Sequence, residues 1–307
     1  MRNTGCPTCP HADSDLTARA CRGASIRPAS VEAFSVSCHD HQVKTYELTD
    51  EWAEQQWATM LPQIETMMHR IQNRADFVVQ PGSQLAADDA ASQPYTVSYC
   101  AKACLNAGVG HLHAMKTLVF DEPRIRHAEA DYSLIRGALE NFATAFWVLH
   151  PQQRTIRVER ALRWMAQNFR DEDKAVGPLE LPDDMEMPAD VETRGLQELH
   201  DVVAAIAQKA GCANVLGGYT STQAVKYAEE HSHYDRVLLM WQVCSGFAHG
   251  RPWANLGMNA MVEKHPTEEE GVFDVRLTTD DKRLALATLP AFGLMAAVVG
   301  LFTGRCR

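Results

Sequence analysis

Positive charge is scarce in this chain of 307 residues. The sequence has 29 Lys and Arg residues against 39 Asp and Glu residues, so its formal net charge is -10. A negative surface opposes non-specific attraction to nucleic acid or to anionic lipid. Binding of either kind would therefore need a local basic patch.

The first 30 residues lack the unbroken apolar segment of a secretory leader, because cysteines, prolines and charges interrupt them. We therefore expect a cytoplasmic protein. The chain has nine cysteines, an odd number. Cys100, Cys104, Cys212 and Cys244 fall in expected helices, where free thiols behave as small apolar side chains. No disulfide framework is expected.

Apolar residues recur at helical spacing through most of the chain after residue 45. Residues 1–45 show no such pattern, so we expect an irregular or disordered arm there and a single helical bundle domain over residues 46–307. Two short runs near the end differ: "LGMNAMVEK" and "GVFDVRLTT", the second with Phe273, Val275 and Leu277 in alternation. The sequence predicts an all-α bundle of about seven or eight helices with one small β-hairpin before the C-terminal helix.

The C-terminal segment Leu284 to Phe302 carries no charge and is long enough to span a bilayer, which takes about 20 residues. A membrane-attached accessory protein is therefore one hypothesis. A buried core helix is the favoured interpretation of this segment. It is rich in Ala and Gly, it has Pro290 in its middle, and an amphipathic bundle precedes it. Membrane partners are therefore not expected.

The stretch "WQVCSGFAHGRPWA", Trp241 to Ala254, ends a predicted helix. Residues four apart share a helix face, so Ser245 could contact His249, which could then serve as a general acid or base. The alternative is structural: Gly250 and the proline after it are typical of a helix end. Arg251 and Trp253 are candidate binding residues beside this site.

Arg136 and Glu140 lie four residues apart on an otherwise apolar segment, "YSLIRGALEN". Buried charges need partners, so an internal ion pair is one interpretation. The other is that the pair lines a polar cleft with Ser245 and His249. We list Arg136, Glu140, Ser245 and His249 as candidate catalytic residues on this second interpretation.

These motifs carry a resemblance. "YSLIRGALENFATAFWVLHP", "YDRVLLMWQVCSGFAHGRPWA" and the hairpin running into "LTTDDKRLALATLP" resemble a group of uncharacterised bacterial all-helical proteins with Arg-x3-Glu and Ser-x3-His-Gly helix motifs. More distantly, the layout is similar to the HEPN superfamily. That superfamily includes RNases of toxin and defence systems and inactive nucleotide-binding relatives, so the resemblance implies a helical bundle that binds nucleotide or RNA.

The HEPN nuclease motif is Arg-x4 to 6-His, and only Arg194 and His200 have this spacing here. Such a spacing arises readily by chance, so it does not predict a nuclease. The leading hypothesis is a HEPN-like binding or regulatory module of a defence or toxin system. A metal-independent RNase that uses His249 for proton transfer is the alternative.

Arginines follow one another at three-residue steps along the segment "RTIRVERALR", at positions 154, 157, 160 and 163. Such a stripe could hold RNA or nucleotide phosphates, and we take Arg157 and Arg160 as its candidate binding residues. A solvated helix face with nearby acids is the simpler interpretation.

Cys6 and Cys9 in the arm have the C-x2-C spacing of half a zinc site. No second pair with standard spacing follows, so zinc is a weak prediction and no other cofactor is expected. Nothing in the sequence establishes a homodimer, because it has no heptad repeat.

Overall fold

The computed structural model describes residues 16–20, 33–37, 43–121, 127–176 and 195–307. Within these ranges the chain forms ten α-helices and one 3₁₀ turn, η1 (Val215–Gly217). The helices are α1 (Asp50–Gln72), α2 (Gln84–Ser92), α3 (Val97–Phe120), α4 (Ala130–Leu149), α5 (Arg154–Val176), α6 (Leu196–Ala210), α7 (Ser221–His231), α8 (Val237–Ala248), α9 (Pro252–Met258) and α10 (Asp281–Arg305).

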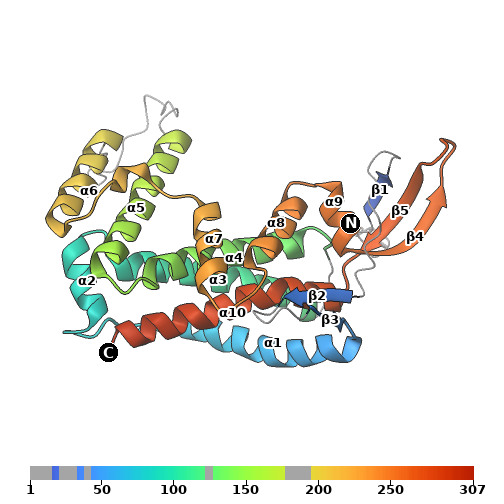
Figure 1. The fold of residues 1–307 in the computed structure, drawn as a ribbon, viewed down its shortest axis with the longest axis horizontal. Helices are drawn as coiled ribbons and strands as arrows, with labels where there is room; N and C mark the ends of the chain where they lie inside the picture. The colour runs from blue at the N-terminus through green and yellow to red at the C-terminus, as the bar shows by residue number, and fades with distance from the viewer. Residues whose placement is uncertain (1–15, 21–32, 38–42, 122–126, 177–194) are drawn as a thin grey trace, which may run out of the picture.

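Helix α4 is the centre of the bundle. It contacts α3, α5, α7, α8 and α10, and residues 142–149 are buried without interruption. Figure 1 shows α1, α3, α4 and α10 lying along the long axis of the molecule, with α5 and α6 at one end and a small sheet at the other. The nearly all-apolar sequence of α4 explains its central position, because a helix without a polar face must be covered on all sides.

The strands form two small sheets. The predicted hairpin is present as β4 (Ala260–Pro266) and β5 (Phe273–Thr278), which pair antiparallel directly before α10. Strand β1 (Leu16–Ala20) pairs with the other edge of β5, so that sheet has the order β1-β5-β4. Strands β2 (Ala33–Ser37) and β3 (Val43–Glu47) pair with each other. The all-α bundle with one hairpin before the last helix is therefore confirmed.

The sequence predicts about seven or eight helices, and the described residues form ten, of which α2 and α9 are short. Helix α2 lies inside the segment 80–94, whose Gly, Pro and Asp content predicts a linker, and it begins where Ser83 Oγ accepts a hydrogen bond from the Ala86 amide. Helix α9 begins at Pro252, a residue well suited to a first helical turn. Both are too short for an apolar period to reveal them.

Two strands, at residues 16–20 and 33–37, fall within the predicted arm 1–45, and a third, at residues 43–47, crosses its end. The helical periodicity does not detect them, because side chains in a strand alternate with a period of two residues. Strand β1 depends in addition on pairing with the distant strand β5. Cys6 and Cys9 lie outside the described residues, so the zinc prediction stays a prediction.

Helix α10 packs inside the bundle against α1, α3, α4 and α8. In the described part of the chain it is the one helix long and apolar enough to cross a membrane, and 61% of its apolar window is buried. Asp280 caps its first turn, accepting a hydrogen bond from the Arg283 amide at 2.8 Å. The packing agrees with the prediction of a core helix.

Three arginines converge on the carboxyl end of α4. Arg160 donates to the Trp147 carbonyl, Arg157 to the carbonyls of residues 151 and 152, and Arg305 to those of residues 149, 150 and 151. Carbonyls at this end lack partners within the helix, and the helix dipole is negative there. The guanidinium groups satisfy both requirements and bring α5 and α10 to the same place.

Candidate functional site

Helix α8 ends in a complete set of helix-terminating hydrogen bonds. The Gly250 amide donates to the Phe247 carbonyl at 2.9 Å, and the Arg251 amide donates to the Gly246 carbonyl at 2.8 Å. Gly250 has φ +59°, the left-handed conformation that such an end needs and that glycine adopts without strain. The interpretation of "HGRP" as a helix end therefore accounts for the backbone conformation of this stretch.

The same helix end borders a cavity of about 350 Å³, here named the helix-end pocket. Its lining residues come from α8, the turn after it and the start of α9: Trp241, Gln242, Ser245, Gly246, His249, Arg251 and Trp253. The side chains of His249 and Arg251 are exposed, and Trp253 is 50% exposed. Among the described residues, neither the His249 side chain nor the Arg251 side chain has a hydrogen-bond or ion-pair partner.

Ser245 and His249 line this pocket together but do not form the expected hydrogen bond. The Ser245 hydroxyl is buried and has no partner in the described ranges. His249 is the C-cap residue, with φ -106° and ψ 12°, so it has left the helical conformation that places residues four apart above one another. The contact predicted from the spacing is lost for this reason.

Arg136 and Glu140 form an ion pair on α4, with 3.0 Å between Arg136 Nη2 and Glu140 Oε1. Their side chains are 29% and 24% exposed, so the pair lies beside the core rather than in it. Trp241 Nε1 donates to the same carboxylate oxygen at 2.8 Å. The pair thus reaches the wall of the helix-end pocket through Trp241, not through Ser245 or His249.

The chemistry available at the helix-end pocket is limited by these contacts. The thiol of Cys244 is fully buried, and burial raises its pKa far above the usual range, with Arg136 opposing the rise. It is therefore not a nucleophile near neutral pH. No carboxylate of the described residues hydrogen-bonds His249, so a nucleophile, base and acid triad is not assembled there.

Glu140→Ala tests the ion pair. We expect this change to lower the free energy of unfolding by about 1–2 kcal/mol, because it leaves Trp241 Nε1 without its acceptor and Arg136 without its counter-charge. Denaturant unfolding measures the loss. Glu140→Gln keeps an acceptor for Trp241 and should cost less. A loss under about 0.5 kcal/mol for Glu140→Ala, typical of surface changes, would show that the pair does not stabilise the fold.

The arginine stripe of α5 is not one continuous solvated face. Arg157 is buried and forms a two-bond ion pair with Asp88, at 2.6 Å from Nε and 2.8 Å from Nη2. Arg163 pairs with Glu159 at 3.7 Å. The prediction that Arg157 binds an external phosphate is wrong, since an internal carboxylate already occupies its hydrogen-bonding edge.

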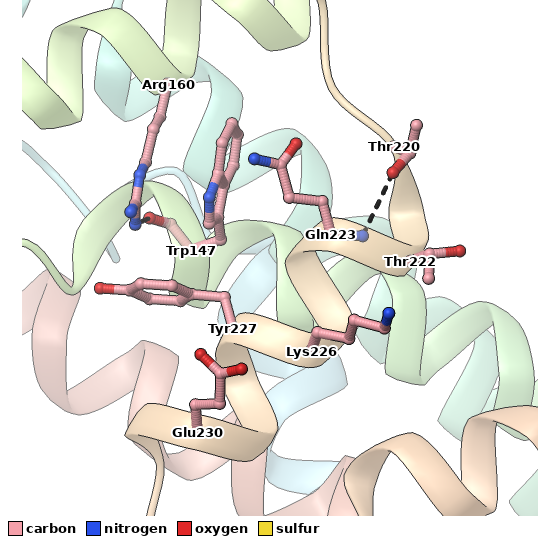
Figure 2. Close-up of a pocket in the computed structure, with 8 residues that line it drawn as sticks. All are labelled: Trp147, Arg160, Thr220, Thr222, Gln223, Lys226, Tyr227 and Glu230. Atoms are coloured by element: carbon pink, nitrogen blue, oxygen red, sulfur yellow. Dashed lines mark hydrogen bonds between the residues drawn. The ribbon is translucent and has the colours of Figure 1, made fainter.

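Arg160 borders a second cavity, of about 430 Å³, here named the Arg160 pocket. Trp147 of α4 and Arg160 of α5 form one side. The other lining residues come from the start and exposed face of α7: Thr220, Thr222, Gln223, Lys226, Tyr227 and Glu230. Figure 2 shows Arg160 reaching from α5 towards the Trp147 backbone, with the Tyr227 ring beneath it.

Tyr227 is held firmly in the wall of the Arg160 pocket. Its ring lies 4.1 Å from the Arg160 guanidinium carbon and stacks on His231 at 4.0 Å between ring centroids. Its hydroxyl lies 2.9 Å from Nδ1 of His150. Burial lowers the pKa of His150, and the nearby His231, Arg160 and Arg305 lower it further. The lowered pKa favours the neutral imidazole of His150, whose Nδ1 can donate or accept the hydrogen bond with the Tyr227 hydroxyl, depending on its tautomer.

Sequence reasoning selected Arg160 but missed Trp147, Lys226 and Tyr227. The one available signal was the short connection between α4 and α5, because a connection of a few residues keeps the positions on either side of it close together. That connection brings Trp147 and Arg160 together. The contribution of α7 follows only from the tertiary structure.

Metal ligands are not clustered in the part of the chain that the structure describes, since it contains no group of three or more His, Cys, Asp or Glu side chains able to hold an ion. Comparisons with known protein families, with curated proteins and with solved structures find no match for this chain.

Proposed function

We propose that the chain is a HEPN-like helical binding or regulatory module that takes a nucleotide or the end of an RNA at the helix-end pocket. The resemblance of its helix motifs to bacterial helical proteins supports the HEPN-like assignment, and a defence or toxin system is the setting that this resemblance implies. The choice of ligand rests on the chemistry of Trp253, Arg251 and His249.

The observation that carries the proposal is the placement of Trp253. An ideal Cβ on Gly246 would lie 2.9 Å from Cζ2 of Trp253, so the indole rests against the backbone of α8 where only glycine leaves room. The ring is held in place and is still 50% exposed. An exposed, fixed aromatic ring is a stacking platform for a base, worth about 1–3 kcal/mol per stacked base.

Charge at the same pocket suits a phosphate. Arg251 is exposed and has no acidic partner among the described residues, although the chain as a whole carries a net charge of -10. The imidazole of His249 lines the pocket beside it, and the unpartnered hydroxyl of Ser245 offers a further polar contact. A base on Trp253 and a phosphate at Arg251 would use all of these groups.

Calorimetric titration with AMP and with a short single-stranded RNA tests this proposal. We expect Arg251→Ala and Trp253→Ala each to weaken binding about tenfold, the loss of roughly 1.4 kcal/mol of stacking or charge contact. Arg154→Ala and Tyr99→Ala remove an exposed arginine and an exposed aromatic ring elsewhere and should bind as wild type does. Absence of binding, or equal losses in the control variants, would overturn the proposal.

The exposure of His249 beside Arg251 favours a second candidate function, a metal-independent RNase. His249 would move the proton and Arg251 would hold the phosphate. RNA cleavage that persists in EDTA and disappears in His249→Ala, with binding retained, would support the RNase. If wild type binds RNA without cleaving it, the chain is a binding module alone.

A further inference from the structure

Arg157 and Arg160 lie one turn apart on α5 and use their guanidinium groups in the same way, with one difference. Each gives Nη1 to a backbone carbonyl, Arg157 at 2.7 Å to residue 152 and Arg160 at 2.6 Å to residue 147. Arg157 then presents its Nε and Nη2 edge to both carboxylate oxygens of Asp88. The same edge of Arg160 has no partner among the described residues, and it is not buried.

From this comparison we infer that the Arg160 pocket binds an oxyanion, the phosphate or carboxylate group of a small organic molecule, which occupies at Arg160 the place that Asp88 occupies at Arg157. The planar edge of a guanidinium matches two oxygens of either group. This site is separate from the helix-end pocket and does not depend on the function proposed for it.

Contacts with neighbouring groups hold the guanidinium group of Arg160 in one orientation. Its guanidinium carbon lies 5.0 Å from the Trp147 ring and 4.1 Å from the Tyr227 ring, and the Trp147 carbonyl fixes Nη1. These contacts restrict a side chain that otherwise has many rotamers. Binding therefore does not require the ordering of a long flexible group, which commonly costs about 0.5–1.5 kcal/mol per side chain.

Lys226 provides a second cation in the same pocket. Its side chain is exposed, and within the described ranges no acid pairs with it. In the view of Figure 2, the Trp147 ring and the Gln223 side chain stand between Arg160 and Lys226. Two cations that pair with no acid in the described part of the chain border one cavity, although the net charge of the chain is -10. Such an arrangement attracts an anion.

Glu230 limits what else the ligand can carry. It is the one acid among the pocket's lining residues, and its carboxylate lies 4.0 Å from His231 Nδ1. A ligand that extends past Tyr227 towards Glu230 needs a hydroxyl or amino group there. The volume of about 430 Å³ falls in the range of small-molecule sites, so a hydroxylated or amino-bearing phosphate or carboxylate is the class that fits.

Titration of the full chain with inorganic phosphate and, separately, with malonate tests the inference, with chloride at equal ionic strength as the blank. We expect at least one of the two anions to bind with a Kd in the millimolar range, since each offers only the anionic part of the ligand. Lys226→Ala should weaken binding about fivefold and Arg160→Lys about tenfold. The anion with the lower Kd shows whether the ligand is a phosphate or a carboxylate.

Two matched variants make the result specific. Arg251→Ala removes the arginine that the proposed function assigns to a phosphate, so the anion binding that remains in this variant belongs to the Arg160 pocket. Adding Lys226→Ala to Arg251→Ala should weaken that remaining binding about fivefold. Lys226 is exposed, so its replacement tests the site even if Arg160→Lys fails to fold. Loss of anion binding in Arg251→Ala but not in Lys226→Ala would overturn the inference. So would a lack of binding of either anion up to about 20 mM.

Discussion

Asp88→Ala should lower the free energy of unfolding by about 3–5 kcal/mol and the melting temperature by about 10 °C. The carboxylate is fully buried, and it is the acid that pairs with the buried guanidinium of Arg157. Removing it leaves that cation buried without a counter-charge, which costs far more than the loss of two hydrogen bonds alone. Denaturant and thermal unfolding measure the effect.

Arg305 adds to the cost of losing Asp88. Burial lowers the pKa of Arg305, the Arg157 charge lowers it further, and Asp88 opposes both effects. One carboxylate thus stabilises two buried cations. Asp88→Asn keeps oxygen for one hydrogen bond and should cost less than Asp88→Ala, and so should the double replacement Asp88→Leu with Arg157→Met. If Asp88→Ala costs under about 1 kcal/mol, the buried pair is not what joins α2 to α5.

Arg305→Ala should cost about 2–3 kcal/mol of unfolding free energy. This side chain donates to the carbonyls of residues 149, 150 and 151 and, through Nη1, to Oε1 of Gln84 at 2.8 Å. Without it, carbonyls at the carboxyl end of α4 lose their partners and α10 loses its attachment there. The cost stays below that of Asp88→Ala because the change also removes a cation from beside Arg157.

Arg307 is the matched control for Arg305, since it is an arginine two residues further along the same chain end and its side chain is exposed. Arg307→Ala should leave stability within about 0.5 kcal/mol of wild type. Arg305→Lys keeps the charge but not the forked donors, so it should fall between the two. Equal stability of the Arg305 and Arg307 variants would mean that the hydrogen bonds to α4 contribute nothing.

Asp88→Ala and Arg305→Ala change residues that lie close to Arg160, because three arginines donate to carbonyls at the same end of α4. Arg160 takes the Trp147 carbonyl while Arg157 and Arg305 take the carbonyls that follow. Among the described residues, the Trp147 carbonyl is the hydrogen-bond acceptor found for Arg160, and no acid pairs with it. The architecture that stabilises α4 is thus the same one that presents a free guanidinium edge to the cavity.

Helix positions were predictable from the sequence because the apolar period is a local property. The nearly all-apolar segment of α4, the Thr49 cap of α1 and the Asp280 cap of α10 each depend on residues within a few positions of one another. The glycine and proline that end α8 belong to the same class. The short helices α2 and α9 could not be predicted in this way, since fewer than about three turns show no clear apolar period.

The partners of individual side chains were decided by the tertiary structure. Arg157 and Arg160 look alike in the sequence, three positions apart in one stripe, yet Asp88 neutralises one and no described acid neutralises the other. Asp88 is 69 residues away from Arg157, and Tyr227 reaches Arg160 from a third helix. Spacing along a helix determines which face a residue occupies, but the charge and rings that meet that face come from distant segments brought together only by folding.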